Sequence, residues 1–432
     1  MVSLAGSQSP SGSTTRIRSH GRSMRTIRSH FYEDANYSPP PPPARSASVS
    51  EVLTDSVVDF HLRELSAASG TAASKSASID AATDLLELSR DFSDFSSFSS
   101  DISGELQKLA LTPSRAIESR PPYDFDADDT DAVDSVSVGA VEPAVRSSVE
   151  TLRSGSDAEK RAAAARIRLL AKHRSDFRSL IGGSGAIEAL VPLLRSTDPA
   201  AQENAVTALL NLSLEESNKD PVTAAGAIKP LVYALRTGTA TAKQNAACAL
   251  LSLSMIEDNR TTIGVLGAIP PLISLLINGS ARGKKDALTT LYKLCSARQN
   301  KGRAVSAGAV GPLVGLVGER RSGMAEKAMV VLGSLAEVEE GRAAIMEEGG
   351  ITALVEAIEE GPARGREFAV MALLQLCADS PHCRGLLVRE GAIPPLVALS
   401  QSGSARAKHK AETLLGYLRE QRQDGALSGM AR

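Results

Sequence analysis

The chain has 432 residues and a formal net charge of −2 at pH 7; 42% of its residues are hydrophobic, but only 3% are aromatic. The near balance of charge argues against bulk nucleic-acid binding. Because no run of about 18 apolar residues occurs, we expect no transmembrane helix.

Residues 1–145 differ in composition from the rest of the chain. Serine, proline, alanine and aspartate dominate this region, which contains an unbroken proline run from Pro39 to Pro43. Its apolar patches are short, so it cannot bury enough surface to offset the entropy of the chain, and we expect it to be mostly disordered. Charge is unevenly distributed within it: residues 1–32 hold five arginines and no acid, whereas residues 124–134 are acidic.

The basic N-terminal stretch has two interpretations. It is rich in Arg and Ser and poor in acids, as organelle transit peptides are, but a basic disordered tail is the favoured interpretation. Serines lie near arginines at Arg16–Ser19, Arg25–Ser29 and Arg45–Ser48, a pattern that basophilic kinases often select. Ser-rich segments also produce this pattern by chance. The hypothesis is that phosphorylation adds negative charge to a basic regulatory arm.

From residue 185 onward, a short motif recurs at an almost constant spacing. Gly-Ala-Ile or a close variant begins at six positions, separated by steps of 41, 41, 41, 41 and 42 residues: Gly185, Gly226, Gly267, Gly308, Gly349 and Gly391. A single globular core does not produce such a period. The spacing therefore indicates one supersecondary unit stacked on copies of itself, and a binding surface is the default function.

Each unit contains three helical patterns. The motif opens an apolar run with helical spacing, which ends at a glycine such as Gly238 or Gly279. A longer helix rich in Ala and Leu follows, as at 202–213, and a short helix such as 259–264 precedes the next motif. Three helices in a unit of this length are typical of armadillo repeats.

We therefore expect an all-α, right-handed solenoid of about six to seven armadillo repeats over residues 146–423. Residues 1–145 and 424–432 are predicted to be disordered regions on either side of it. Residues 159–171 are predicted to form the long helix of a unit whose first part is missing or degenerate.

The long helices supply the candidate binding site. In armadillo arrays they line a concave groove, and residues at i, i+3 and i+7 share one helix face. Three columns of equivalent residues can be followed from unit to unit. The first column is Asn204, Asn245, Asp286, Lys327, Phe368 and Lys410; the second is Thr207, Cys248, Thr289, Val330, Met371 and Thr413; the third is Asn211, Ser252, Lys293, Ser334, Gln375 and Tyr417.

The first and third columns are mostly polar, which suits hydrogen bonding to an extended peptide of a partner protein. An ordinary solvated face is the alternative interpretation of any single residue. The candidate protein-binding residues are Asn204, Asn211, Asn245, Ser252, Asp286, Lys293 and Gln375.

No catalytic, cofactor-binding or metal-binding pattern is evident, and we expect a protein that is not an enzyme and has no cofactor. No histidine lies in a recognisable catalytic setting, and there is no P-loop. The four cysteines form no C-x-x-C pair, which fits free thiols in a reducing compartment rather than a zinc site. They are Cys248, Cys295, Cys377 and Cys383.

Four stretches of the repeat region carry a resemblance to a known family: 204–213, 256–260, 282–287 and 394–403. Through them, residues 156–423 resemble the armadillo region of plant U-box/armadillo-repeat proteins. In that family the array selects substrates or binds kinases, while a separate U-box recruits the ubiquitin-conjugating enzyme. A U-box has a Cys-Pro-hydrophobic signature near its start, and residues 1–145 contain no cysteine, so the chain resembles the members without a U-box.

The resemblance implies a protein–protein interaction scaffold that binds a partner segment in the groove. The expected partners are proteins, for example a kinase, a ubiquitin-pathway enzyme or a transcriptional regulator, and not nucleic acid or a membrane. We expect a monomer in the cytoplasm, the nucleus or both. The alternative function is that of a substrate adaptor for a U-box protein or another ubiquitin ligase.

Overall fold

The structure, a computed structural model, describes residues 137–172, 174–319 and 323–430. Within this range the regular elements are all helices, without a strand. The predicted disordered region up to residue 136, with its basic stretch and its serine sites, lies outside the described residues.

The helices of the described residues form seven consecutive units. The first unit contains α5 (Val138–Ser154) and α6 (Asp157–Leu170), and each later unit contains a short helix, a middle helix and a long helix in that order. The six later units are α7 (Ser175–Gly183), α8 (Ala186–Leu190) with the 3-10 helix η2 (Val191–Arg195), and α9 (Pro199–Ser213); α10 (Glu216–Ala224), α11 (Ile228–Thr237) and α12 (Ala240–Leu253); α13 (Glu257–Val265), α14 (Ile269–Asn278) and α15 (Ala281–Cys295); α16 (Arg298–Ser306), α17 (Val310–Gly318) and α18 (Ala325–Leu335); α19 (Glu339–Glu347), α20 (Gly350–Glu360) and α21 (Ala363–Cys377); and α22 (Pro381–Arg389), α23 (Ile393–Ser402) and α24 (Ala405–Met430).

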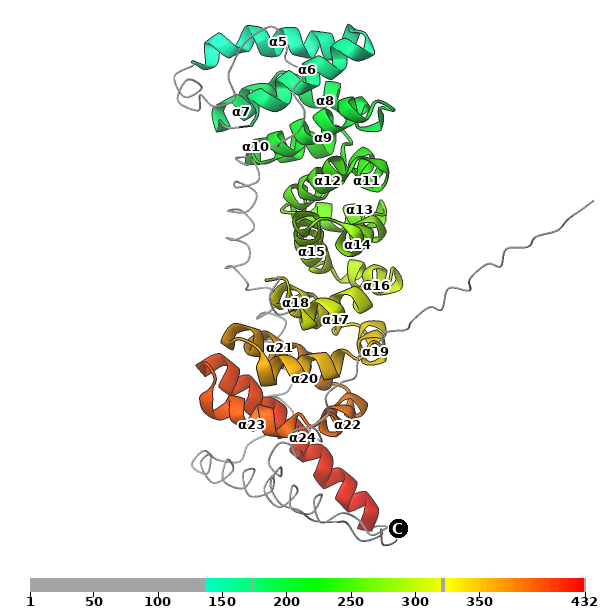
Figure 1. The fold of residues 1–432 in the computed structure, drawn as a ribbon, viewed down its shortest axis with the longest axis vertical. Coiled ribbons are helices and arrows are strands. Elements are labelled where there is room, and N and C mark those ends of the chain that lie inside the picture. Colours follow the sequence, from blue (N-terminus) through cyan, green and yellow to red (C-terminus); the bar gives the residue numbers. More distant parts are fainter. Residues whose placement is uncertain (1–136, 173, 320–322, 431–432) are drawn as a thin grey trace, which may run out of the picture. The chain divides into compact units, whose positions relative to one another are not determined.

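Consecutive units stack through equivalent helices, as Figure 1 shows. Each long helix packs on the long helix of the preceding unit, from α6 and α9 through to α21 and α24. Middle helices pack on middle helices in the same way, as α17 does on α20. The predicted all-α armadillo solenoid of six to seven repeats is therefore confirmed.

The first and last described helices lie partly outside residues 146–423, and the predicted domain bounds stay a prediction. Helix α5 begins at Val138, and α24 runs to Met430. In the first unit, α5 takes the place of the middle helix and packs on α6. This helix has no Gly-Ala-Ile motif at its start, which explains why the repeat pattern did not reveal it.

The recurring glycine ends each short helix. At all six positions its φ lies between +73° and +85°, in the left-handed region that glycine adopts without steric cost. The Gly226 N–H donates to the Thr223 carbonyl at 2.9 Å, and the Ala227 N–H donates to the Val222 carbonyl at 3.3 Å. These are the two bonds of a Schellman motif. Because Ala227 and Ile228 are then buried, Gly-Ala-Ile encodes the turn from a short helix into a middle helix.

Buried asparagines join the short helices to their neighbours. Asn259 donates from Nδ2 to the Leu253 carbonyl at the end of α12 and to Thr223 Oγ1 on α10, both at 3.0 Å. Asn218 and Asn300 each donate to the corresponding long-helix carbonyl and to a backbone carbonyl of the preceding short helix, that of Arg178 or Arg260. A side chain that satisfies two acceptors in two elements fixes both the turn and the spacing of the stack.

Candidate functional site

The long helices begin at caps that also bind the preceding unit. Thr239 Oγ1 accepts a hydrogen bond from the Ala242 N–H at 3.1 Å and donates to Glu203 at 2.7 Å. Ser280 Oγ accepts from the Gly283 N–H at 3.1 Å and from Gln244 Nε2 at 2.6 Å. One residue therefore both caps its own helix and fixes the distance to the helix before it.

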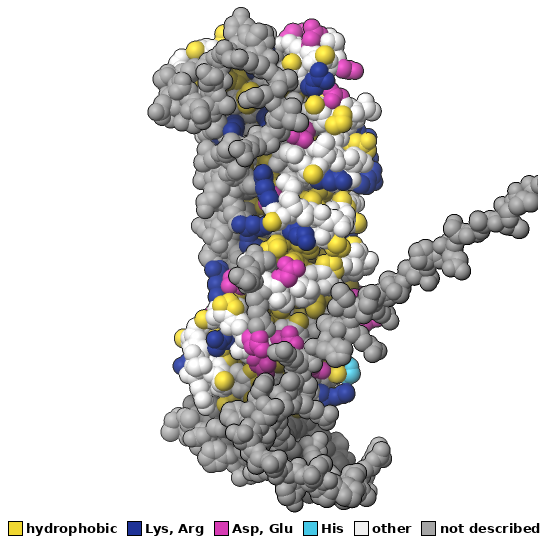
Figure 2. All heavy atoms as spheres, in the orientation of Figure 1, with side chains coloured by type: hydrophobic (Ala, Val, Ile, Leu, Met, Phe, Trp, Pro, Cys, Tyr) yellow, Lys and Arg dark blue, Asp and Glu magenta, His cyan; other side chains and the backbone are white. Residues whose placement is uncertain are grey.

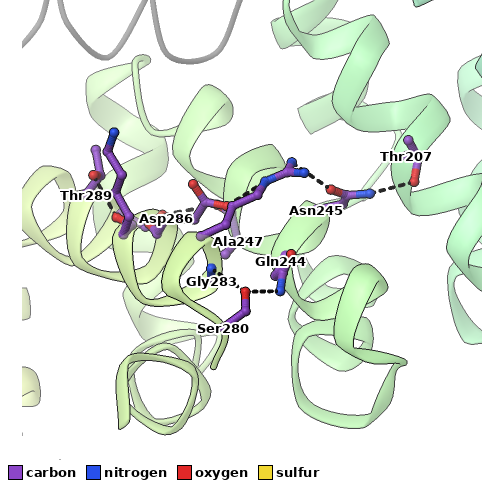
Figure 3. Close-up of polar contacts among 11 residues, drawn as sticks. Thr207, Gln244, Asn245, Ala247, Ser280, Gly283, Asp286 and Thr289 are labelled. Atoms are coloured by element: carbon purple, nitrogen blue, oxygen red, sulfur yellow. Dashed lines mark hydrogen bonds and ion pairs between the residues drawn. The ribbon is translucent and has the colours of Figure 1, made fainter. Parts of the chain in front are cut away.

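The first and second columns contact each other across consecutive units. Asn245 Nδ2 donates to Thr207 Oγ1 at 2.9 Å, and Lys327 Nζ donates to Thr289 Oγ1 at 3.3 Å (Figure 3). Between these two pairs, burial and then the neighbouring Asp286 carboxylate raise the pKa of the Cys248 thiol. In all three cases a first-column residue lies against the second-column residue of the preceding unit.

Arg282 on α15 also joins the first-column residues of two consecutive units. Its Nη2 donates to Asn245 Oδ1 at 3.3 Å, and its Nε lies 3.5 Å from Asp286 Oδ2 (Figure 3). Nearer the start of the stack, Arg168 Nη1 donates to Asn204 Oδ1 at 2.9 Å. Three first-column residues, Asn204, Asn245 and Asp286, are thus each bonded to an arginine of a long helix.

Three residues of the third column donate hydrogen bonds to backbone carbonyls of the preceding long helix. Asn211 Nδ2 donates to the Arg168 carbonyl at 3.1 Å, and Ser252 Oγ donates to the Ser213 carbonyl at 2.7 Å. Ser334 Oγ makes the corresponding bond to the Cys295 carbonyl at 3.2 Å. Since the last carbonyls of a helix have no partner within it, these side chains complete the hydrogen bonding of the helix ends.

The structure therefore brings the predicted residues together, but as contacts between units. Five of them are buried: Asn211, Asn245, Ser252, Asp286 and Gln375. Asn204 and Lys293 are half-buried and accessible from solvent. The side-chain oxygen of Gln375 is enclosed and accepts no hydrogen bond from a described residue. Partner binding through these seven residues stays a prediction, and most of them have a structural contact that the sequence did not reveal.

A column of basic residues on the short helices was not predicted from the sequence. It comprises Arg178, Lys219, Arg260, Lys301, Arg342 and Arg384. Arg260 Nε donates to the Ser254 carbonyl at 3.0 Å, and Arg342 Nη1 donates to the Ala336 carbonyl at 2.9 Å. Both carbonyls lie at the C-terminal end of a long helix, where a cation is favourable. The spacing of these six cations equals that of the glycines, and this regularity was the available signal.

Potential metal ligands do not cluster in the described part of the chain. No group of three or more His, Cys, Asp or Glu side chains there could hold a metal ion. All four cysteines are buried free thiols. Burial raises the pKa of the Cys295 thiol to about 12, so this sulfur is protonated and poorly nucleophilic near neutral pH.

A comparison with protein families identifies this architecture. The description "Plant U-box protein ARM repeat region" belongs to a family model that matches residues 144–428. The chain belongs to this family.

Curated relatives match shorter parts of the chain. U-box domain-containing protein 4 of Arabidopsis thaliana is 58% identical over 77 residues, which are 18% of this chain and 9% of the relative. U-box domain-containing protein 12 of Oryza sativa subsp. japonica is 60% identical over 63 residues, 15% of this chain and 10% of the relative. The chain thus spans about a tenth of the length of these relatives.

A solved structure shares the fold. An engineered protein from the Northeast Structural Genomics Consortium superposes with a TM-score of 0.59 over 86% of each chain, at 21% sequence identity. At this level of identity, the likeness concerns the fold alone.

A helix that crosses a membrane must be both long and apolar. None of the described helices alone is long and apolar enough to cross a bilayer. Two bent pairs, α7 with α8 and η2, and α13 with α14, satisfy length and composition only when taken together, with bends of 81° and 83°.

Proposed function

We propose that this chain is a non-enzymatic scaffold that binds an extended segment of a partner protein along the face of its long helices. The observation that carries the proposal is the unbroken packing of long helix on long helix from α6 to α24. This packing lines up equivalent positions, while the residues at those positions change from unit to unit. Such a surface suits a linear ligand that contacts several units in turn.

The accessible side chains on this face define where a partner would bind. Lys285 is exposed on α15, and Lys293 lies half-buried two turns further along the same helix. Burial and then the nearby Arg260 lower the pKa of Lys293, so this amine is partly desolvated and close to another cation. A carbonyl or carboxylate of a partner would relieve both effects. With 3% aromatic residues, affinity would come from many modest polar contacts rather than from aromatic anchors.

Affinity capture with the full chain tests the proposal. We would compare the wild type with a variant carrying Lys285→Glu and Lys293→Glu, using extracts of plant cells and quantitative mass spectrometry. The matched control carries Lys229→Glu and Arg236→Glu, which reverse two exposed charges on the middle helix α11. We expect the first variant to lose about tenfold or more of the captured proteins and the control to retain them. Equal retention by both variants would remove the long-helix face from consideration.

A second candidate function is that of a substrate adaptor in ubiquitin transfer. It is supported by the names of the relatives, which are U-box domain-containing proteins. The adaptor would bind a client on the long-helix face and a separate ligase elsewhere. Reconstituted ubiquitination with a plant U-box ligase, with and without the full chain, separates the two functions. Stimulation of client modification would favour the adaptor, whereas no stimulation of any tested ligase would count against it.

We also propose that the protein resides in the cytoplasm or nucleus. The support is the set of four reduced, buried thiols within the repeats. A fluorescent fusion at the C-terminus tests this proposal together with the transit-peptide interpretation, since accumulation in plastids or mitochondria would contradict it.

A further inference from the structure

The first long helix, α6, exposes a face that every later long helix buries. When the helices are aligned by their repeat spacing, Arg166 is equivalent to six fully or almost fully buried residues: Ala208, Ala249, Thr290, Val331, Ala372 and Leu414. On α6 itself, Arg166 is exposed and Leu169 is 62% exposed, the largest value among the exposed large hydrophobic residues in the described range. We call the stripe formed by Ala162, Ala165, Arg166, Leu169 and Lys172 the α6 end face.

The stretch of chain that carries this face is strongly basic in composition. Residues 160–178 contain seven Lys and Arg residues and one acid, Asp176. Burial and then the neighbouring Arg168 lower the pKa of Lys172, which shows that cations crowd one another at this end of α6. A carboxylate placed nearby would be attracted to both side chains.

A segment of complementary charge precedes α5 directly in the chain. Residues 124–134 include six aspartates, and two aromatic residues, Tyr123 and Phe125, stand at its start. Aromatic residues make up only 3% of the chain, so their presence among the aspartates is unusual. The segment therefore combines negative charge, which complements the cations of the α6 end face, with aromatic side chains, which complement the exposed Leu169.

The chain connectivity brings this segment to the right place. Helices α5 and α6 are joined through Gly155 and Ser156 and pack on each other, so they form a helical hairpin (Figure 1). The start of α5 at Val138 consequently lies near the end of α6, where Leu169 and Lys172 are found. A fully extended stretch of ten residues before Val138 can span about 33 Å. This exceeds the length of α6, which at 14 residues is about 21 Å.

We propose that residues 123–134 dock on the α6 end face and close the first end of the stack. Their aspartates lie beside Arg166 and Lys172, and an aromatic side chain covers Leu169. The segment thereby takes the place that a preceding unit would occupy, which is the role of a terminal cap in a repeat protein. Because Leu169 is equivalent to Asn211 of the third column, the docked segment also borders the first position of the long-helix face.

Electrostatics disfavour the surface of α20, in the sixth unit of the stack, as the docking place. Glu356, Glu359 and Glu360 are exposed on α20, and Figure 2 shows acidic side chains gathered over the region of α20 and α21. Burial, Glu360 and Glu356, in that order, raise the pKa of Glu359, so carboxylates already repel one another there. An acidic segment would add to that repulsion.

Zero-length carbodiimide cross-linking of the full chain tests the docking. An equal mixture of unlabelled and ¹⁵N-labelled chains is cross-linked at low concentration and mapped by mass spectrometry. We expect links from the aspartates of residues 126–131 to Lys160 or Lys172, within single chains. Links that join labelled to unlabelled chains, or that favour Lys229 or Lys243 on later units, would overturn the proposal.

Hydrogen exchange supplies the second readout. In the variant Asp126→Asn, Asp128→Asn, Asp129→Asn and Asp131→Asn, we expect the amides of α6 to exchange about fivefold faster or more. The matched control, Asp91→Asn, Asp94→Asn, Asp101→Asn and Glu105→Gln, removes four charges elsewhere in the same region and should leave α6 unchanged. An unchanged α6 in the first variant, or an equal effect of both variants, would contradict the docking.

Discussion

The side-chain oxygen of Asn300 occupies the space that a Cβ atom on Gly264 would need. An ideal Cβ at Gly264 would lie 1.9 Å from Asn300 Oδ1, and the same distance separates a Cβ at Gly182 from Asn218 Oδ1. In the unit between these two, Thr223 replaces the glycine, and its Oγ1 accepts a hydrogen bond from Asn259 instead. Short helices of consecutive units therefore match small or hydroxyl-bearing residues to the asparagine of the next unit.

Replacing Gly264 by alanine should destabilise the stack. The added methyl group would push Asn300 away from the Arg260 and Leu294 carbonyls, to which it donates at 2.8 and 3.0 Å. We expect a loss of about 1–3 kcal/mol in the free energy of unfolding, measured by urea denaturation of the full chain. The control is Gly302→Ala on the neighbouring short helix α16, where a Cβ meets nothing within 4 Å. That change should be neutral or stabilising by up to about 1 kcal/mol. Equal effects at the two sites would contradict the close packing.

Replacing Asn259 by alanine should remove two buried hydrogen bonds at once. The Leu253 carbonyl, which accepts from Nδ2 at 3.0 Å, would then lose this partner in the interior. We expect a cost of about 1–3 kcal/mol, seen as a lower urea midpoint. Asn278→Ala, at the exposed end of α14, serves as the control and should change stability by less than about 0.5 kcal/mol. A variant at residue 259 as stable as this control would show that the asparagine bonds contribute little.

The stability of the protein should fall in alkaline solution in part through Cys295. Burial raises the pKa of this thiol to about 12 in the folded chain, against the effect of Lys301, from an ordinary value of 9.0. A raised folded pKa means that the contribution is complete below the unfolded pKa and is lost as pH rises toward the folded one. Between about pH 9 and about pH 11, the free energy of unfolding should therefore decline more steeply in the wild type than in Cys295→Ala. Parallel declines would show that this thiol does not titrate differently on folding.

Much of the fold was predictable because its turns depend on local backbone chemistry. A glycine with positive φ at every short-helix end leaves a period of 41 residues, and Gly226 with Ala227 shows how the motif specifies both the turn and the buried residues after it. The long helix of the first unit was predicted at 159–171, but α5 was not, because it begins without that motif and contains Pro143. Its position depends on packing against α6 and α7, which a period in the sequence does not record.

The candidate site was less predictable for a geometric reason. Helical spacing places Asn245 and Ser252 on one face of α12, but it does not say how far the next helix overlaps that face. In the structure the overlap is large enough for Asn245 to reach Thr207 and for Ser252 to reach the Ser213 carbonyl. Columns of polar residues therefore mark contacts between units as readily as they mark contacts with a partner.

The first and second columns join consecutive units of the stack. A double-mutant cycle between Asn245 and Thr207, whose Nδ2 and Oγ1 atoms lie 2.9 Å apart, tests this connection most directly. The free energy of unfolding of the full chain is measured for the wild type, Asn245→Ala, Thr207→Val and the double variant. We predict a coupling energy of about 0.5–1.5 kcal/mol, as for a buried hydrogen bond. Additivity of the two substitutions within about 0.3 kcal/mol would contradict this connection.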